Sequence, residues 1–172
     1  MKKLLLVIIP IVIIVVGILI LGSRNKENPQ NPKTQNIENS KEQTSRQIPG
    51  YQGNVLTNEG SPYLEFTKTD YEKALAEGKI IVLNFYANWC PVCRVEQPEV
   101  IKGFDSLNSS DVVGFRVSFN DSDTDDDEKQ LAKQFKIPYQ HTKLILKNGQ
   151  EVKRSGDQWD KETFLKEVNS IL

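Results

Sequence analysis

The segment Ile80–Cys93 reads IIVLNFYANWCPVC and contains the only two cysteines of the 172-residue chain. Residues 80–86 are mostly apolar and partly β-branched, which is typical of a buried strand. After the cysteines, apolar residues recur at helical spacings of three and four between residues 100 and 107. The sequence therefore predicts a strand, a tight turn and a helix, with a Cys-x-x-Cys pair at the junction.

A Cys-x-x-Cys at a strand-to-helix junction is typical of a thiol–disulfide redox site. Cys90 would lie at the helix N-terminus, where unpaired backbone N–H groups and the helix dipole favour a thiolate. A purely structural disulfide to Cys93 would close too short a loop to remove much entropy from the unfolded chain. A zinc site would need a second cysteine pair or more than one histidine. We therefore predict a redox-active Cys90–Cys93 disulfide, with no separate cofactor and no metal.

The N-terminus predicts a membrane anchor. An uncharged apolar run from Leu4 to Leu21 follows two lysines, and as a helix of roughly 27 Å it is just long enough to span a bilayer. A cleaved signal peptide is the alternative, but residues 18–23 offer a poor small-x-small cleavage site. We expect residues 1–3 on the cytoplasmic side and 4–22 as a single-pass signal anchor. The C-terminal part would then lie on the extracytoplasmic side of the cytoplasmic membrane.

Two further segments follow the anchor. Residues 23–57 are rich in Asn, Gln, Lys, Glu, Ser and Pro, and we expect a flexible polar linker because so few apolar side chains cannot offset the entropy of ordering. Residues 58–172 have the size of one domain with a single core. The formal net charge of −1 shows no excess of basic residues of the kind that indicates nucleic-acid binding.

Within this domain the patterns predict the order β-α-β-α-β-α-β-β-α, a mixed sheet with helices on both faces. The expected elements are strands at 63–66, 80–86, 112–119, 143–146 and 151–154, and helices from 69 to 78, after Cys90, around 131–135 and at 164–172. The acidic run Asp121–Glu128 superficially resembles a calcium loop but lacks its sixth-position Gly and its twelfth-position carboxylate. We expect a solvated loop that ends in helix-capping Asp residues.

This order resembles that of the thioredoxin family over residues 64–172. The resemblance is carried by FYANWCPVCR at 85–94, Pro98 inside the helix, Lys147-Asn148-Gly149 at the hairpin and Gly156 before the last helix. It implies a thioredoxin fold and a thiol–disulfide oxidoreductase with Cys90 as nucleophile and Cys93 as resolving cysteine. The anchor and linker resemble those of extracytoplasmic bacterial thioredoxins, some of which reduce apocytochrome c or other exported proteins.

The chain departs from the family at the position six residues before the first cysteine. The family usually has a buried Asp there that helps to move protons, whereas this chain has Asn84, which cannot ionise. Either Asn84 is a strand residue satisfied by hydrogen bonds, or proton transfer takes another route. Glu96 is a candidate substitute, but its helical position favours a solvated surface charge.

A second departure concerns the family's cis-proline. In the ungapped register His141 takes its place, followed by the expected Thr142, whereas Pro138 would take it only with an insertion. A cis bond before a residue other than proline costs about 2.5–4 kcal/mol, so we expect a trans peptide at His141.

If His141 faces Cys90, several roles follow. An imidazolium would lower the thiol pKa, and a neutral imidazole could accept its proton. Alternatively, His141 packs or hydrogen-bonds within its loop, or completes a three-ligand metal set with Cys90 and Cys93.

The sequence thus predicts a membrane-tethered oxidoreductase that exchanges disulfides with exported proteins, more as a reductant than an oxidant, and that depends on a membrane electron-transfer partner. A non-catalytic binding module is the alternative from another class. We expect Trp89 and Pro91 to shape the docking surface, and Gln140, His141 and Thr142 to line the edge that binds a substrate strand. Val92 is expected in the shell around the cysteines, together with Trp89, Pro91, Asn84 and His141.

Overall fold

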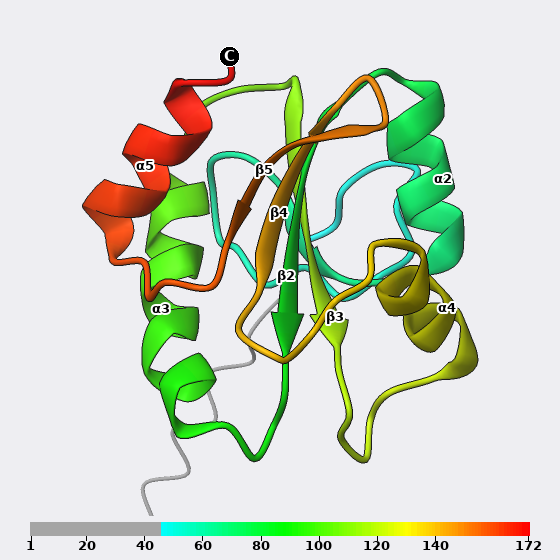
Figure 1. Ribbon diagram of the computed structural model, residues 1–172. Helices are drawn as coiled ribbons and strands as arrows, with labels where there is room; N and C mark the ends of the chain where they lie inside the picture. The colour runs from blue at the N-terminus through cyan, green and yellow to red at the C-terminus, as the bar shows by residue number, and fades with distance from the viewer. Residues whose placement is uncertain (1–45) are drawn as a thin grey trace, which may run out of the picture. The chain divides into compact units, whose positions relative to one another are not determined.

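The computed structural model of the chain describes residues 46–172 (Figure 1). The predicted anchor at 4–22 and the linker up to residue 45 lie outside the described residues. Within residues 46–172, no helix is long and apolar enough to cross a membrane.

The predicted order of elements is confirmed. The described part of the chain runs β1 (Tyr63–Glu65), α2 (Lys68–Ala76), β2 (Ile80–Tyr86), α3 (Pro91–Ser106), β3 (Val112–Ser118), α4 (Asp126–Gln134), β4 (Lys143–Lys147), β5 (Gln150–Ser155) and α5 (Lys161–Asn169). The five strands form one sheet in the order β1-β3-β2-β4-β5. Strands β1, β3 and β2 pair in parallel, and β4 and β5 add an antiparallel hairpin beside β2. The sheet is therefore mixed, with β2 at its centre.

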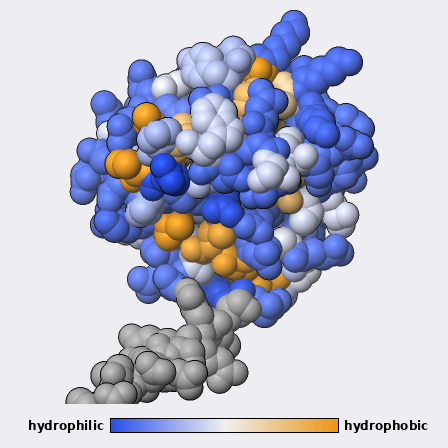
Figure 2. Space-filling view, turned by 90° about the horizontal axis from the view of Figure 1, so that it is seen from below, coloured by the Kyte–Doolittle hydropathy of each residue, from blue (hydrophilic) through white to orange (hydrophobic). Residues whose placement is uncertain are grey.

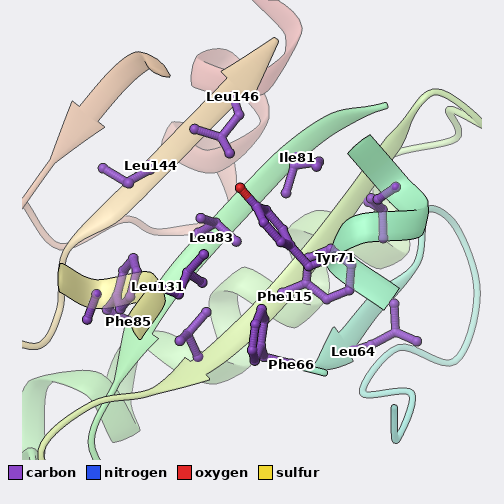
Figure 3. Packing of buried hydrophobic residues seen from close by; sticks show 14 of the residues in the cluster. Leu64, Phe66, Tyr71, Ile81, Leu83, Phe85, Phe115, Leu131, Leu144 and Leu146 are labelled. Carbon is purple, nitrogen blue, oxygen red and sulfur yellow. The ribbon is translucent and has the colours of Figure 1, made fainter. Parts of the chain in front are cut away.

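Two apolar layers bury the central strand. The side chains of Ile81, Leu83 and Phe85 join the cluster under α2 and α4 (Figure 3), whereas Ile80 and Val82 join the cluster under α3 and α5. Successive strand residues point to opposite faces, so a continuous apolar run is what a doubly covered strand requires. Figure 1 shows the same arrangement, with α3 and α5 on one side of the sheet and α2 and α4 on the other.

Helix α3, which follows the active-site turn, is held closely against α5. Pro98 lies inside α3, as predicted. A Cβ added to Gly103 would lie 2.3 Å from Cδ1 of Phe164, so only glycine permits this approach. The Phe104 ring stacks on Tyr63 of β1, with ring centroids 4.6 Å apart. Packing on both sides therefore fixes the helix that carries the cysteines.

Helix α4 begins earlier than its apolar residues indicate. The Asp125 side chain accepts a hydrogen bond from the Glu128 backbone N–H, and the Glu128 side chain accepts one from the Asp125 N–H. This reciprocal capping box starts the helix at Asp126. The prediction of helix-capping aspartates is confirmed.

The chain contacts the domain upstream of residue 58, where the predicted linker was expected to end. The Arg46 guanidinium donates hydrogen bonds to the carbonyls of Glu59 and Gly60. The buried Asp70 carboxylate accepts the backbone N–H groups of Gln52 and Gly53. Residues 46–57 therefore pack on the domain, where Tyr51 and Val55 lie against one apolar cluster and Leu56 lies against the other.

The close approach of α3 and α5 gives a test of the packing. We expect Gly103→Ala to lower the free energy of unfolding by about 1–3 kcal/mol, because the new methyl group overlaps the Phe164 ring. Urea denaturation measures this. The neighbouring exposed change Lys102→Ala should stay within about 0.5 kcal/mol of wild type. Equal stability of the two variants would contradict the tight contact.

Candidate active site

The cysteine pair lies at the junction between the end of β2 and the start of α3 (Figure 1). Cys90 is the N-cap of α3, and its Sγ accepts a hydrogen bond from the Cys93 backbone N–H at 3.2 Å. Pro91 follows at the first helical position, where a missing N–H costs nothing. Both cysteines are free thiols and are buried. Cys90 therefore lies at the helix N-terminus, as predicted, where donated backbone N–H groups favour negative charge on a sulfur.

The second thiol is held neutral. Burial raises the pKa of Cys93 to about 12, and the adjacent Cys90 and the Glu96 carboxylate act in the same direction. At neutral pH Cys93 therefore keeps its proton. It must pass that proton to an acceptor before it can attack a disulfide.

Asn84 is a buried strand residue whose side-chain amide nitrogen is hydrogen-bonded. Its Nδ2 donates to the Tyr63 hydroxyl at 3.1 Å, and that hydroxyl donates to Oε1 of Gln97 at 3.3 Å. Burial raises the pKa of Tyr63 to about 12. No member of this group changes charge near neutral pH, so the network offers no acceptor for the Cys93 proton.

The prediction that Glu96 is a solvated surface charge is wrong. Glu96 is 1% exposed. Its Oε1 accepts hydrogen bonds from Lys143 Nζ and from the Trp159 backbone N–H, each at 2.6 Å. Glu96 lies three residues after Cys93 and so shares the inward face of α3. A charge can be buried there because Lys143, 47 residues away in sequence, compensates it.

Lys143 is the buried cationic partner of this carboxylate. Its side chain is 1% exposed, and Nζ also donates to the carbonyl of Asp157 at 2.6 Å. Burial lowers the pKa of Lys143, while Glu96 opposes that shift. The ion pair joins α3 to β4 about one helical turn along α3 from Cys93, and sequence patterns alone did not identify it.

His141 lies immediately before β4, next to the end of β2. Its backbone N–H donates to the carbonyl of Phe85 at 2.6 Å. The backbone carbonyl of Thr142 accepts a hydrogen bond from the Phe85 N–H. The peptide bond before His141 is trans, as predicted, and so is the one at Pro138, because residues 46–172 contain no cis peptide. His141 instead adopts a left-handed backbone conformation with φ of 71°.

The imidazole contacts Glu96. Nδ1 lies 2.9 Å from Oε2 of Glu96, at an angle that makes no hydrogen bond, and the side chain is 12% exposed. Burial, followed by the positive charge of Lys143, lowers the pKa of His141, and Glu96 opposes this. The imidazole is therefore neutral at pH 7, which disfavours the imidazolium role.

The described residues contain no ready-made metal centre. Between residues 46 and 172, no three His, Cys, Asp or Glu side chains are placed to hold a metal ion. The structure thus does not assemble Cys90, Cys93 and His141 into the three-ligand set considered above.

The surface around the cysteines is apolar and aromatic. Trp89 and Val92 are 53% and 43% exposed, and the Trp89 Nε1–H donates to the Asn120 carbonyl at 3.0 Å. Tyr139, which the sequence analysis missed, is 51% exposed, and its ring lies against Gly156. Figure 2 looks at this end of the molecule and shows apolar patches among hydrophilic side chains.

The residues predicted to bind a substrate strand differ in how exposed their side chains are. Gln140 is half-buried, whereas Thr142 is buried and its hydroxyl donates to the Tyr139 carbonyl at 2.9 Å. The Thr142 side chain therefore stabilises its own loop and is not available on the surface.

The comparisons with known proteins agree with this geometry. The Thioredoxin family model matches residues 62–170. A thioredoxin H-type from Fagopyrum esculentum is 38% identical over 87 residues, which cover 49% of this chain and 66% of the relative. A protein disulfide-isomerase from Ricinus communis is 34% identical over 93 residues, which cover 53% of this chain and 18% of the relative. The solved structure of thioredoxin from Aeropyrum pernix aligns with a TM-score of 0.50 at 16% identity over 62% of this chain and 85% of that one, which shows the fold alone.

A thioredoxin fold with two free cysteines at the N-terminus of α3 defines a class, the thiol–disulfide oxidoreductases. Within that class, the chain belongs to the thioredoxin family. The match spans 66% of the Fagopyrum relative and less than a fifth of the Ricinus one.

The buried ion pair gives the test of this site. We expect Lys143→Met to lower the free energy of unfolding by about 3–5 kcal/mol, because it leaves the Glu96 carboxylate buried without its partner. The double variant Glu96→Gln/Lys143→Met removes both charges and should recover most of that loss. Urea denaturation at pH 7 compares the variants. If the double variant instead lost as much stability as Glu96→Gln and Lys143→Met lose separately when summed, the two charges would not act as a pair.

Proposed function

We propose that this protein reduces disulfide bonds in exported proteins by a Cys90/Cys93 dithiol–disulfide cycle. The observation that carries the dithiol–disulfide cycle, in whichever direction it runs, is the hydrogen bond from the Cys93 N–H to Cys90 Sγ at the start of α3. It supports Cys90 as the attacking thiolate, with Cys93 one turn away to complete the exchange. The exposed Trp89 and Val92 beside the pair offer a polypeptide substrate an apolar contact.

The proposed cycle has two displacements. The Cys90 thiolate attacks one sulfur of the substrate disulfide, forms a mixed disulfide with it and releases the other substrate sulfur as a thiolate, which takes up a proton. Cys93 then loses its proton and attacks the Cys90 sulfur, which closes the Cys90–Cys93 bond and releases the second substrate thiol. Two electrons pass from the protein to the substrate.

The proton of Cys93 is central to the second step. We propose that Glu96 accepts it, in place of the Asp that the family usually has at the position of Asn84. Support comes from the influence of the Glu96 charge on the pKa of Cys93 and from the burial of both groups on the same face of α3. Lys143 and the Trp159 N–H hold the Glu96 carboxylate in place for this role.

The proposed setting is the outer side of the cytoplasmic membrane. The apolar run at 4–22 and the polar stretch that follows it support a single-pass anchor with an extracytoplasmic domain. A protein that reduces its targets there becomes oxidised with each turnover. A membrane partner that donates electrons is therefore part of the proposal.

One observation favours an oxidant as the second candidate. Stabilisation of the Cys90 sulfur by a backbone N–H favours the reduced pair, and a stabilised reduced form makes a disulfide a stronger oxidant. The same residues would then run the two displacements in reverse and leave a disulfide in the exported protein.

Cysteine variants test the cycle. In an insulin-reduction assay with dithiothreitol, we expect wild-type protein to accelerate the appearance of turbidity and Cys90→Ser to lose that acceleration, because the attacking sulfur is gone. In a separate mixture of reduced protein and insulin without dithiothreitol, Cys93→Ser should accumulate a mixed disulfide, visible as a mass adduct that later addition of dithiothreitol removes. Turbidity from Cys90→Ser as fast as from wild type would point to a non-catalytic binding module.

A further inference from the structure

A pocket of about 360 Å³ lies beside the active-site tryptophan. Its wall includes Asn120, whose carbonyl accepts the hydrogen bond from Trp89 Nε1–H. A polypeptide that contacts Trp89 while its disulfide reacts at Cys90 would therefore extend next to this pocket. The pocket is lined by Phe119, Asn120, Thr124, Glu128, Lys129, Ala132, Lys133, Lys136 and Ile137.

The pocket combines an apolar floor with a cationic rim. Phe119 and Ala132 are buried apolar residues of its lining. Three lysines of α4 and the turn after it also line the pocket, and one of them, Lys129, pairs with Asp126. Within residues 46–172, Lys133 and Lys136 are exposed and form no ion pair. The rim therefore presents two uncompensated positive charges above an apolar surface.

Lys136 occupies a backbone position that normally belongs to glycine. The Ile137 N–H bonds to the Ala132 carbonyl and the Lys136 N–H to the Lys133 carbonyl, which is a Schellman motif at the end of α4. Lys136 is the left-handed residue of that motif, with φ of 49°. A side chain other than glycine at this position carries backbone strain.

Three acidic residues near this end of the molecule, Asp121, Asp123 and Glu128, accept hydrogen bonds within the domain. Asp121 accepts a hydrogen bond from the Asn88 backbone N–H, and Asp123 accepts one from Asn88 Nδ2. Neither residue lines the pocket. The pocket lining does include the Glu128 carboxylate, but its two oxygens accept the backbone N–H groups of Ser118 and Asp125.

We propose that this pocket binds an acidic segment of the protein partner, with an apolar side chain on its floor and an adjacent carboxylate between Lys133 and Lys136. The charge of the rim favours a carboxylate, and the contact between Asn120 and Trp89 places the pocket beside the proposed site of disulfide exchange. The inference rests on the proposed function, because the partner docks there to present its disulfide to Cys90.

Two model substrates test the preference. Both are peptides of equal length with one intramolecular disulfide, followed by Leu-Glu-Glu in one and Leu-Gln-Gln in the other. We expect reduced full-length protein in detergent to reduce the acidic peptide about tenfold faster at low salt. The difference should largely disappear at 0.5 M salt, where charges are screened. Equal rates at low salt would overturn the proposal.

Variants assign the preference to the pocket. Lys133→Gln/Lys136→Gly should reduce the two peptides at equal rates and should be no less stable than wild type, because glycine relieves the left-handed strain. Lys161→Gln/Lys166→Gln removes the same charge from α5 and should keep the preference. Loss of the preference in both variants would show an effect of net charge only and would overturn the proposed site.

Cysteine-to-serine versions of the same peptides separate this inference from the proposed function. Stronger binding of the acidic version, with NMR shifts at Phe119 and Ile137 in wild type but not in Lys133→Gln/Lys136→Gly, would support the pocket even if the protein reduced no disulfide. In that case the insulin assay would show that the proposed function fails. Equal binding of both versions would overturn the pocket while insulin reduction continued.

Discussion

The Glu96 carboxylate is the group on which the packing of α3 against β4 and the His141 loop depends. It receives Lys143 of β4 and the Trp159 N–H before α5, and the imidazole of His141 lies beside it. Burying two charges carries a large desolvation cost, so the pair persists only in a geometry that satisfies both partners. The requirement fixes α3 against β4 and thereby positions the resolving cysteine relative to the loop before β4.

His141 stands at the position where the resemblance to the thioredoxin family places a proline, and the backbone there differs accordingly. In this structure His141 has a positive φ, and its N–H bonds to Phe85. Proline fixes φ near −65° and has no N–H, so it could not adopt this conformation. The loop is instead held by that backbone bond and by the Thr142 hydroxyl on the Tyr139 carbonyl. A substrate strand would meet a different backbone edge here from the one the resemblance implied.

The active-site turn and the start of α4 could be predicted from the sequence, because each depends on residues that lie close together in the chain. The apolar run of β2 and the Cys-x-x-Cys placed the active-site turn, and the aspartates before α4 indicated its cap. The burial of Glu96 could not be predicted in this way, because its partner Lys143 lies on another element and appears in sequence as a charge at the start of an apolar strand. The packing of residues 46–57 likewise depends on a distant group, the buried Asp70 carboxylate.

The reduction potential of the Cys90–Cys93 pair tests the central claim most directly. The full-length protein in detergent is equilibrated with glutathione buffers at pH 7, and the reduced fraction is followed by tryptophan fluorescence or thiol alkylation. We predict a single two-electron transition at about −270 mV, the value of a reducing thioredoxin. A transition at about −120 mV would contradict this prediction and identify the protein as an oxidant that introduces disulfides.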